Sequence, residues 1–424
     1  MNRWPEFTVA ELEAAGVLLV EDGNHGEYRP RPDEFVEGGT TFIRAADLTD
    51  GQVMFDEAGT ISDVALARIR KGIGQPEDIL FSHKGTVGKL ARVPEHAPPF
   101  VCSPQTTFWR VLDESRLRRD YLYAYMRSSV FIDQWWVRKG ETDMADYVSL
   151  TAQRQLRIVL PPTDIQERIG RPLATIDDLI ENNDRRIVLL EEMAKTIYRE
   201  WFVHLRFSGS DATTFIDSPA GEVLEGWSIA PLRALVEISR DTVDAPEVPA
   251  QLPAVGLEHI PRRQLTLDDW GQAGELQSRK TKFTSGDVLF GKIRPYFHKV
   301  SVAPMDGICS TDAIVIRPRH PYWGLVVMTV SSADFVAHAT QTSTGTKMPR
   351  ADWKVIGEYQ VAVPPDDLAE CFTEVVQSHL GAATNLMRTG RNLAMMRDLL
   401  LPKLVTGQID VSRLDLDAMV EATA

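Results

Sequence analysis

A long stripe of apolar residues runs through the middle of the chain at alternating spacings of four and three. It starts at Ile169 and reaches Trp201, and Asn183 is its one polar member. A 3.5-residue phase kept over this length is typical of a helix that pairs with another helix, and a single buried asparagine commonly fixes the register of such a pair. Pro172 is expected to kink or restart the helix near its beginning.

The start of this helix carries a capping signal. Thr163 follows a Pro-Pro pair, and Gln166 comes three residues later, which predicts a capping box. A second Pro-Pro pair, at 364 and 365, precedes a second stripe of similar length that is poorer in large apolar residues. That stripe comprises Phe372, Val375, His379, Ala382, Leu386, Thr389, Leu393, Met396 and Leu400.

The matching length and position of the two stripes favour a pair of helices over two separate bundle cores. Asn183 is expected inside this pair, and His379 is interpreted as a packed histidine and not as a metal ligand. The residues that we expect in the helix pair are Ile176, Ile180, Asn183, Ile187, Leu190, Ile197, Trp201, Leu386, Leu393 and Leu400.

Short β-type runs, broken by Gly and Pro, precede each Pro-Pro pair. The clearest of them are residues 100–102 with 106–111 in the first half, and residue 308 with 313–316 in the second. These runs predict an α+β fold with two mixed α/β domains in tandem, each followed by a long helix.

The chain contains an internal repeat. Asp-Ile-Leu-Phe at 78–81 recurs as Asp-Val-Leu-Phe at 287–290, and Val-Cys-Ser at 101–103 recurs as Ile-Cys-Ser at 308–310. The segment 158–162 recurs at 361–365, so three matches follow in the same order at offsets of 209, 207 and 203 residues. A duplicated module explains this order better than chance does.

Composition adds limits on size and location. A chain of 424 residues suits two or three domains. It has no apolar run of membrane-spanning length and starts without a secretory core, so we expect it in the cytoplasm. Cys102, Cys309 and Cys371 lie far apart without a metal-binding pattern, and they are interpreted as buried thiols.

The charge is distributed unevenly along the chain. The net charge is −14, yet residues 64–140 and residues 276–354 each carry a net charge of +6. Two basic windows in an acidic chain suggest two places that receive phosphate groups. Lys, Arg, amide and hydroxyl side chains in these windows suit phosphates and base edges. The candidate DNA-binding residues are Lys84, Lys89, Gln105, Thr106, Arg110, Lys292, Arg294, Lys299, Thr311, Asp312, Lys347 and Arg350.

Motifs for chemistry are missing from the sequence. The Pro-Pro pairs lack the Asn or Asp and the aromatic residue that an amino-methyltransferase requires, and residues 85–89 lack the spacing of a phosphate loop. Neither a zinc-protease nor a hydrolase motif occurs. Asp78 and Asp287 occupy equivalent places at the start of apolar strands, so we interpret them as parts of a repeated structure and not as nuclease residues. We therefore predict no catalytic residue and no metal site on this chain.

These segments together resemble the specificity subunits of type I restriction-modification systems, over nearly the whole chain. The strongest similarity lies in Leu-Pro-Pro through Gln-Glu at 160–167, in Trp-Phe-Val at 201–203, and in residues 400–404 and 407–411. Phrases typical of target-recognition domains occur at 22–26, 84–89, 291–296 and 345–350.

The resemblance implies two target-recognition domains joined by an antiparallel pair of helices, each domain reading one half of a split double-stranded DNA site. Two methyltransferase subunits that use S-adenosylmethionine, and restriction subunits driven by ATP and Mg²⁺, would then be partners, with no cofactor on this chain. The boundaries we predict are 1–163 for the first recognition domain, 164–204 for the central helix, 205–226 for a linker, 227–365 for the second domain, 366–403 for the second helix and 404–424 for the tail.

Two other functions remain open on sequence alone. The chain could be the recognition subunit of a different class of restriction-modification system, which neighbouring genes would reveal. Alternatively, it could be a coiled-coil scaffold that binds only protein, which a salt-sensitive interaction with DNA would exclude.

Overall fold

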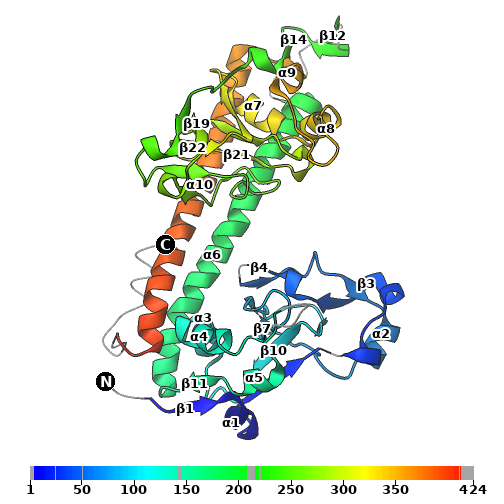
Figure 1. The fold of residues 1–424 in the computed structure, drawn as a ribbon. Helices are drawn as coiled ribbons and strands as arrows, with labels where there is room; N and C mark the ends of the chain where they lie inside the picture. The colour runs from blue at the N-terminus through cyan, green and yellow to red at the C-terminus, as the bar shows by residue number, and fades with distance from the viewer. Residues whose placement is uncertain are drawn as a thin grey trace. The chain divides into compact units, whose positions relative to one another are not determined.

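The structure, a computed structural model, describes residues 4–23, 25–49, 51–140, 146–207, 215–218, 221–409 and 411. The chain forms two compact units: unit 1 consists of Met1–Asp178 and Leu393–Ala424, and unit 2 of Leu179–Asn392. The two long helices, α6 (Thr163–Tyr198) and α10 (Asp366–Val405), each contribute one segment to both units. Figure 1 labels these elements.

Unit 1 is built around a four-stranded antiparallel sheet with the order β2-β10-β7-β8. A second sheet has the order β6-β3-β9, in which β3 and β9 run parallel. Short antiparallel pairs, β1 with β11 and β4 with β5, complete the unit. The strands are β1 (Glu6–Thr8), β2 (Leu18–Asp22), β3 (Phe35–Ile43), β4 (Leu48–Thr49), β5 (Gln52–Val53), β6 (Thr60–Ile61), β7 (Ile79–Ser82), β8 (Leu90–Arg92), β9 (Phe100–Cys102), β10 (Thr106–Val111) and β11 (Arg157–Val159).

Unit 2 repeats this arrangement strand for strand in its main sheet, which has the order β15-β23-β20-β21. Its second sheet has the order β16-β19-β22-β17-β18, again with one parallel pair, β17 with β22. The pair β14 with β24 corresponds to β1 with β11. The strands are β12 (Phe215–Ser218), β13 (Gly221–Leu224), β14 (Ser228–Pro231), β15 (Val236–Ile238), β16 (Thr242–Asp244), β17 (Pro253–Val255), β18 (Gly271–Gln272), β19 (Arg279–Phe283), β20 (Val288–Gly291), β21 (Val300–Val302), β22 (Gly307–Ser310), β23 (Ala313–Pro318) and β24 (Gln360–Val363).

The central strand of each main sheet is buried on both faces, which explains its continuous apolar sequence. In β7, Ile79 and Phe81 join one core cluster, whereas Leu80 between them joins another. Successive side chains of a strand point to opposite faces, so the sheet separates two cores. Leu289 and Phe290 of β20 divide between two clusters in the same way. The repeat predicted from the sequence is therefore confirmed as a repeat of topology and of packing.

Short helices follow the last strand of the main sheet in each unit, namely α3 (Arg119–Arg127), α4 (Ser129–Trp136) and α5 (Leu150–Arg154) in unit 1, and α7 (Trp323–Val330), α8 (Ala333–Gln341) and α9 (Trp353–Ile356) in unit 2. In unit 1 they pack with α6 and α10 around one core cluster, to which Tyr121, Phe131 and Leu173 belong. In unit 2 the equivalent cluster includes Phe335 and Phe372. Two further short helices of unit 1, α1 (Val9–Ala14) and α2 (Asp63–Arg68), precede the strands β2 and β7.

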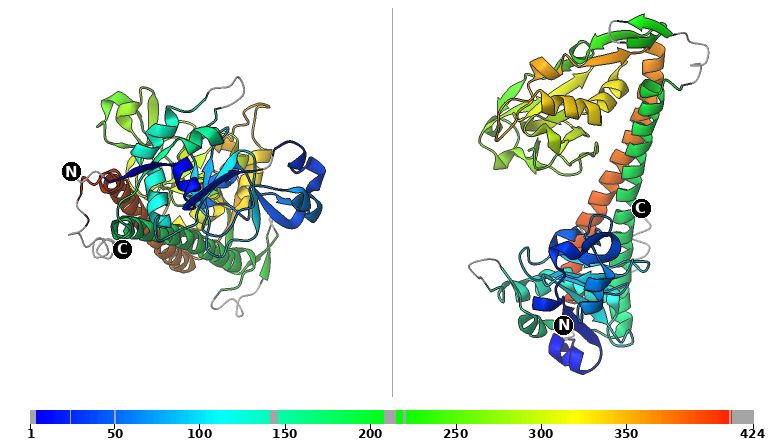
Figure 2. Two further views of the ribbon diagram at one scale, coloured as in Figure 1. Left: turned by 90° about the horizontal axis from the view of Figure 1, so that it is seen from below. Right: turned by 90° about the vertical axis from the view of Figure 1, so that its right-hand side faces the viewer.

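Within each unit, α6 and α10 lie side by side, as Figures 1 and 2 show. In unit 1, Asp177 of α6 forms an ion pair with Arg397 of α10, with 2.7 Å between the carboxylate and the guanidinium. In unit 2, Ile187 of α6 packs with Ala383 and Met387 of α10. Residue numbers thus rise along one helix while they fall along the other, and the predicted antiparallel coiled coil is confirmed.

The stripe predicted for α6 is correct at every position. Ile169, Ile176, Asn183 and Ile187 are buried, and the other members are buried or half-buried. The helix continues through Pro172 without a break, so the predicted restart is wrong. After Tyr198 the chain forms one π-helical turn, Arg199–Val203.

The stripe predicted for α10 is partly wrong. Ala382 is exposed, and the buried row in this part of the helix is Val376, Leu380, Ala383 and Met387. The helix packs against both α6 and the sheet core of unit 2, so its apolar surface is wider than one seam, and the row chosen from the sequence was one position off. Predicted pair members Leu386 and Leu400 are half-buried, and Leu393 is buried.

The predicted capping box at the start of α6 is also wrong. Gln166 is fully buried, and its amide oxygen accepts a hydrogen bond from the backbone N–H of Arg118 at 2.8 Å. Its amide nitrogen donates to the carbonyl oxygens of Arg116 and Pro161. Gln166 thus fastens the helix to the loop before α3. The predicted linker and tail lie partly outside the described residues, and the domain boundaries stay predictions.

Candidate nucleic-acid interface

Four basic candidates of unit 2 lie on two loops that are joined by backbone hydrogen bonds. The loop after β20 carries Lys292 and Arg294, and the loop after α8 carries Lys347 and Arg350. The N–H of Arg294 donates to the carbonyl of Pro349 at 2.7 Å. Isolated bridges join Ile293 to Arg350 and Thr344 to Arg350. The two basic segments thus form one surface, although more than fifty residues separate them in the sequence.

Arg294 has a left-handed backbone conformation, with φ of +48°. A residue other than glycine adopts this conformation rarely, and such residues concentrate at binding and catalytic sites. The turn Pro295–Phe297 follows directly, and His298 after it is also left-handed, with φ of +53°. The loop therefore has a defined bend that exposes the ring of Tyr296.

The equivalent loop of unit 1 follows β7. Lys84 is exposed there, and isolated bridges join Lys84 to Tyr147 and Gly140 to Tyr147. The N–H of Gly85 donates to the carbonyl of Asp146 at 3.0 Å. The same two-loop surface therefore occurs in both units, but tyrosine stands in unit 1 where arginine stands in unit 2. Tyr147 is a residue that the sequence analysis missed; extending the 203-residue offset of the repeat back from 361–365 to Arg350 would have found it.

Two candidate lysines use their ammonium groups in hydrogen bonds to backbone carbonyls of their own unit. The ammonium group of Lys89 donates to the carbonyl of Leu48 at 2.8 Å. Lys299 makes the equivalent bond to the carbonyl of Leu257, and burial lowers the pKa of its ammonium group. Both lysines are half-buried, so each fastens the loop at its base.

Arg110 takes part in the fold through an ion pair, and its predicted contact with DNA stays a prediction. Its guanidinium binds the carboxylate of Asp78 through two bonds of 2.7 Å. Asp78 is almost completely buried, and burial raises its pKa even though the bonds to Arg110 lower it. Arg317 holds Asp287 in the same way in unit 2. This repetition confirms the interpretation of both aspartates as structural residues.

The position of Thr106 corrects the sequence prediction. It is the first residue of β10 and is fully buried, so it cannot contact a base edge. The remaining candidates are compatible with a surface role, which stays a prediction. Lys84, Gln105, Thr311, Lys347 and Arg350 are exposed, whereas Lys89, Lys292, Arg294, Lys299 and Asp312 are half-buried.

Known proteins with the same sequence features come from one family. The family model described as "Type I restriction modification DNA specificity domain" matches residues 25–192. The type I restriction enzyme MjaIX specificity subunit of Methanocaldococcus jannaschii is 22% identical over 348 residues, which cover 78% of this chain and 79% of that protein. The type I restriction enzyme EcoDI specificity subunit of Escherichia coli is 32% identical over 88 residues, which cover 21% of this chain and 20% of that protein.

The fold is also shared with a solved structure. The S subunit of a type I restriction-modification system from M. genitalium superposes with a TM-score of 0.59 at 12% identity, covering 95% of this chain and 96% of that one. The family model and the curated relatives together indicate a type I restriction-modification specificity subunit. Specificity subunits of this type recognise DNA and do not catalyse a reaction themselves.

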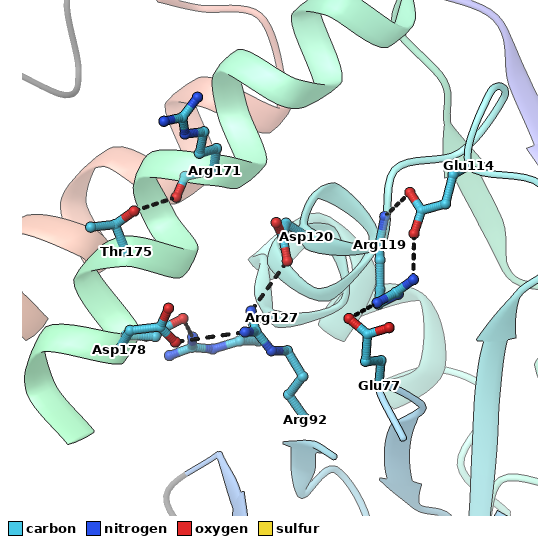
Figure 3. Close-up of polar contacts among 10 residues, drawn as sticks. Glu77, Arg92, Glu114, Arg119, Asp120, Arg127, Arg171, Thr175 and Asp178 are labelled. Atoms are coloured by element: carbon cyan, nitrogen blue, oxygen red, sulfur yellow. Dashed lines mark hydrogen bonds and ion pairs between the residues drawn. The ribbon is translucent and has the colours of Figure 1, made fainter. Parts of the chain in front are cut away.

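Some basic residues of unit 1 pair with carboxylates inside the unit, as Figure 3 shows for Arg92 and Arg119. Arg92 lies 3.2 Å from Asp120 and 3.6 Å from Asp178, and Arg119 pairs with Glu114 at 2.8 Å and with Glu77. Asp178 lies outside the basic window, on α6. The charge of a sequence window therefore overstates the positive surface, because acidic partners come from elsewhere in the chain.

The loop cations differ from these arginines. For Lys84, Lys292, Arg294 and Lys347, no carboxylate of the described residues lies within 4 Å of the charged group. The ammonium group of Lys292 donates to the carbonyl of Thr311 at 2.5 Å. These four charges are therefore not neutralised by a carboxylate of the described residues, and their contact with phosphate groups stays a prediction.

Other sequence expectations concern cysteines, metals and membranes. Cys102 and Cys309 are buried as predicted, and burial raises the pKa of Cys309 to about 12. Cys371 is exposed on α10, so the prediction is wrong for this thiol. The described residues contain no group of three or more His, Cys, Asp or Glu that could hold a metal ion. Among the same residues, no helix is both long and apolar enough to cross a membrane.

His83, at the base of the unit 1 loop, gives a test by pH. Its ring is buried, neither ring nitrogen has a hydrogen-bond partner among the described residues, and burial lowers its pKa from the ordinary value of 6.5. The unfolded chain therefore binds a proton more readily than the native protein does, and unit 1 should lose stability as the pH falls below 6.5.

We expect His83→Leu to remove part of this pH dependence, so that the variant loses less stability than the wild type between pH 7 and pH 5. Hydrogen exchange of the protected amides of β7 and β10 at several pH values, corrected for intrinsic exchange, measures the effect. His96→Leu, at an exposed position, serves as the control and should follow the wild type. Parallel curves for wild type and His83→Leu would contradict the prediction.

Proposed function

We propose that this specificity subunit recognises a bipartite DNA target, with one half-site read by the recognition domain of each unit. The observation that carries the proposal is the duplicated two-loop surface. Each unit presents one such surface on the same main sheet, with Lys84 in one unit and with Lys292 and Arg294 in the other. Two copies of a reading surface in one chain suit a target with two separate halves.

The helix pair supports a second part of the proposal, the recruitment of other subunits. Members of α6 such as Val188, Leu189 and Met193 are exposed although they are apolar. Exposed apolar surface on a helix suits contact with protein. We propose two methyltransferase subunits, which supply S-adenosylmethionine chemistry, and restriction subunits, which supply ATP- and Mg²⁺-dependent cleavage. This complex would work in the cytoplasm, where it meets its DNA.

Salt dependence tests whether the loop cations contact DNA. We expect Lys292→Ala with Arg294→Ala to weaken DNA binding by the assembled complex and to flatten the plot of log affinity against log salt by about one unit per lost phosphate contact. Arg319→Ala, which removes an exposed cation that pairs with Glu237 at 3.5 Å, is the control and should leave the slope unchanged. An unchanged slope and affinity in the double variant would remove both residues from the interface.

The chain purified alone should neither methylate nor cleave DNA, and it should not hydrolyse ATP. Addition of the methyltransferase subunits should restore methylation of adenines, which single-molecule sequencing of the methylated DNA would place in a motif with two specified halves. A methylated motif with only one specified half, in a folded and active complex, would contradict the bipartite proposal. Turnover that remains with the chain through further purification would show that it is itself an enzyme.

A further inference from the structure

The two-loop surfaces of the two units have the same pattern of backbone hydrogen bonds. Individual positions in one unit can therefore be matched with positions in the other. The N–H of His83 donates to the carbonyl of Gln105 at 2.9 Å, and the N–H of Lys292 donates to that of Asp312 at 3.0 Å. Position 105 in unit 1 therefore corresponds to position 312 in unit 2. Both residues immediately precede the equivalent strands β10 and β23.

A second equivalence lies on the other loop. Tyr147 exchanges two backbone hydrogen bonds with Gly140, of 2.9 and 3.1 Å, and Arg350 exchanges two with Thr344, of 3.1 and 2.9 Å. The residue after each continues the match: the N–H of residue 148 donates to the carbonyl of His83, and that of residue 351 to the carbonyl of Lys292. Position 147 therefore corresponds to position 350.

Around these positions the supporting side chains are the same in both units. An aspartate at the start of the central strand binds an arginine of the neighbouring strand, as Asp78 with Arg110 and as Asp287 with Arg317. A lysine at the base of the loop donates to a backbone carbonyl in both. The repeat thus keeps the residues that shape the surface.

The residues that the surface presents have changed. Gln105 is exposed where Asp312 stands in unit 2, and Tyr147 is 36% exposed where Arg350 stands. A side chain that packs in the fold has a reason to stay the same in both copies, whereas a side chain that reads a base changes when the base changes. The backbone hydrogen bonds at positions 105/312 and 147/350 are the same in both units, whereas the side chains differ. This combination indicates that these positions contact the bases of the target.

The chemistry of these side chains indicates which bases they suit. Arg350 has a guanidinium that can donate two parallel hydrogen bonds to O6 and N7 of guanine in the major groove. Its Nη2 lies 3.7 Å from a carboxylate oxygen of Asp312, which holds the group at the rim of a hollow of about 330 Å³ lined also by Lys292, Thr344 and Trp353. Gln105 has an amide, which pairs in the same bidentate way with N6 and N7 of adenine.

We propose that Arg350 reads a guanine in the half-site of unit 2 and that Gln105 reads an adenine in the half-site of unit 1. The inference rests on the proposed function, since it assumes that each unit reads half of one target. It goes beyond that function because it assigns the base preference of each half to a single exposed position on a shared backbone.

The first test replaces Arg350 and maps methylated adenines in a strain that carries the complete complex. Arg350→Ala should relax the requirement for one guanine in one half of the motif and leave the other half unchanged. In binding assays with the purified complex, discrimination for that guanine over the other bases should fall by about 5- to 150-fold. Lys347→Ala, an exposed position on the same loop, should weaken binding to all sequences alike and keep the motif.

The second test replaces Gln105. Gln105→Ala should relax one adenine in the half that Arg350→Ala leaves intact, so the two variants must affect opposite halves. If Arg350→Ala fails to fold, Arg350→Lys replaces it in the test because it retains the positive charge. This variant lacks the two parallel donors of a guanidinium, so it should show a reduced preference for the same guanine.

The inference is overturned if both variants keep the complete motif, if they relax the same half, or if the relaxed positions are not guanine and adenine respectively. Those results would leave the bipartite target of the wild type in place. If the wild-type complex has no bipartite motif, the proposed function fails first, and the inference fails with it.

Discussion

Arg110→Ala should lower the free energy of unfolding of unit 1 by about 3–5 kcal/mol, because it leaves the carboxylate of Asp78 buried without its cation. Asp78 is 1% exposed, and its partner arginine makes two bonds of 2.7 Å to it. Burial already raises the pKa of Asp78, so without Arg110 the carboxyl group is expected to take up a proton instead of remaining charged.

Hydrogen exchange of the protected amides in β7 and β10 measures this loss within the full chain. Arg317→Ala in unit 2 should have a smaller effect, since the side chain of Arg317 is 43% exposed against 18% for Arg110, and water reaches that pair. Arg157→Ala, which removes a surface pair with Glu6, is the control and should change stability by less than about 1 kcal/mol. If Arg110→Ala behaves like this control, the pair does not support the fold.

Glu191→Ala should weaken the attachment of α6 to the sheet domain of unit 2 by about 2–5 kcal/mol. The carboxylate of Glu191 is buried, and it accepts hydrogen bonds from the backbone N–H groups of Leu265 at 2.9 Å and Thr266 at 2.7 Å. Its removal leaves two buried donors without an acceptor, and each unmade bond costs about 1–3 kcal/mol.

Exchange of the Leu265 and Thr266 amides should accelerate more than exchange elsewhere in unit 2. Glu192→Ala is a matched control, because Glu192 is the next residue of the same helix and is 52% exposed, with a surface pair to Lys195. Glu191→Gln keeps one acceptor oxygen and should give an intermediate loss. Equal exchange rates in Glu191→Ala and Glu192→Ala would show that these two bonds do not hold the helix.

Glu191 and Arg110 illustrate what a sequence pattern leaves out. Glu191 occupies a place between apolar stripe positions and looks like any charged residue of a helix surface. Its burial comes from residues 265 and 266, which are more than seventy positions away. Arg110 stands in a basic window and was predicted to bind DNA, but the strand pairing of β7 with β10 brings it to Asp78.

The sequence by itself determined the features that repeat locally. The period of 3.5 residues from Ile169 to Trp201 defined the buried face of α6, because a helix places residues at this spacing on one side whatever surrounds it. The repeated Asp-hydrophobic strands at 78 and 287 predicted two copies of one fold, because equal patterns bury equal faces. The topology of both main sheets agrees with that prediction.

Only the tertiary structure decided which polar residues are free to act. The buried row of α10 depends on two neighbours at once, α6 and the sheet core, and no single period describes a helix with two partners. The positions that we propose as readers, Gln105 with Tyr147 and Asp312 with Arg350, come together through His83 and Lys292. The backbone groups of these two residues bond to both loop segments of their unit, one of which lies more than fifty residues further along the chain. Whether a polar side chain is exposed or paired depends on residues that are distant in the sequence. Composition and spacing along the chain therefore do not predict it.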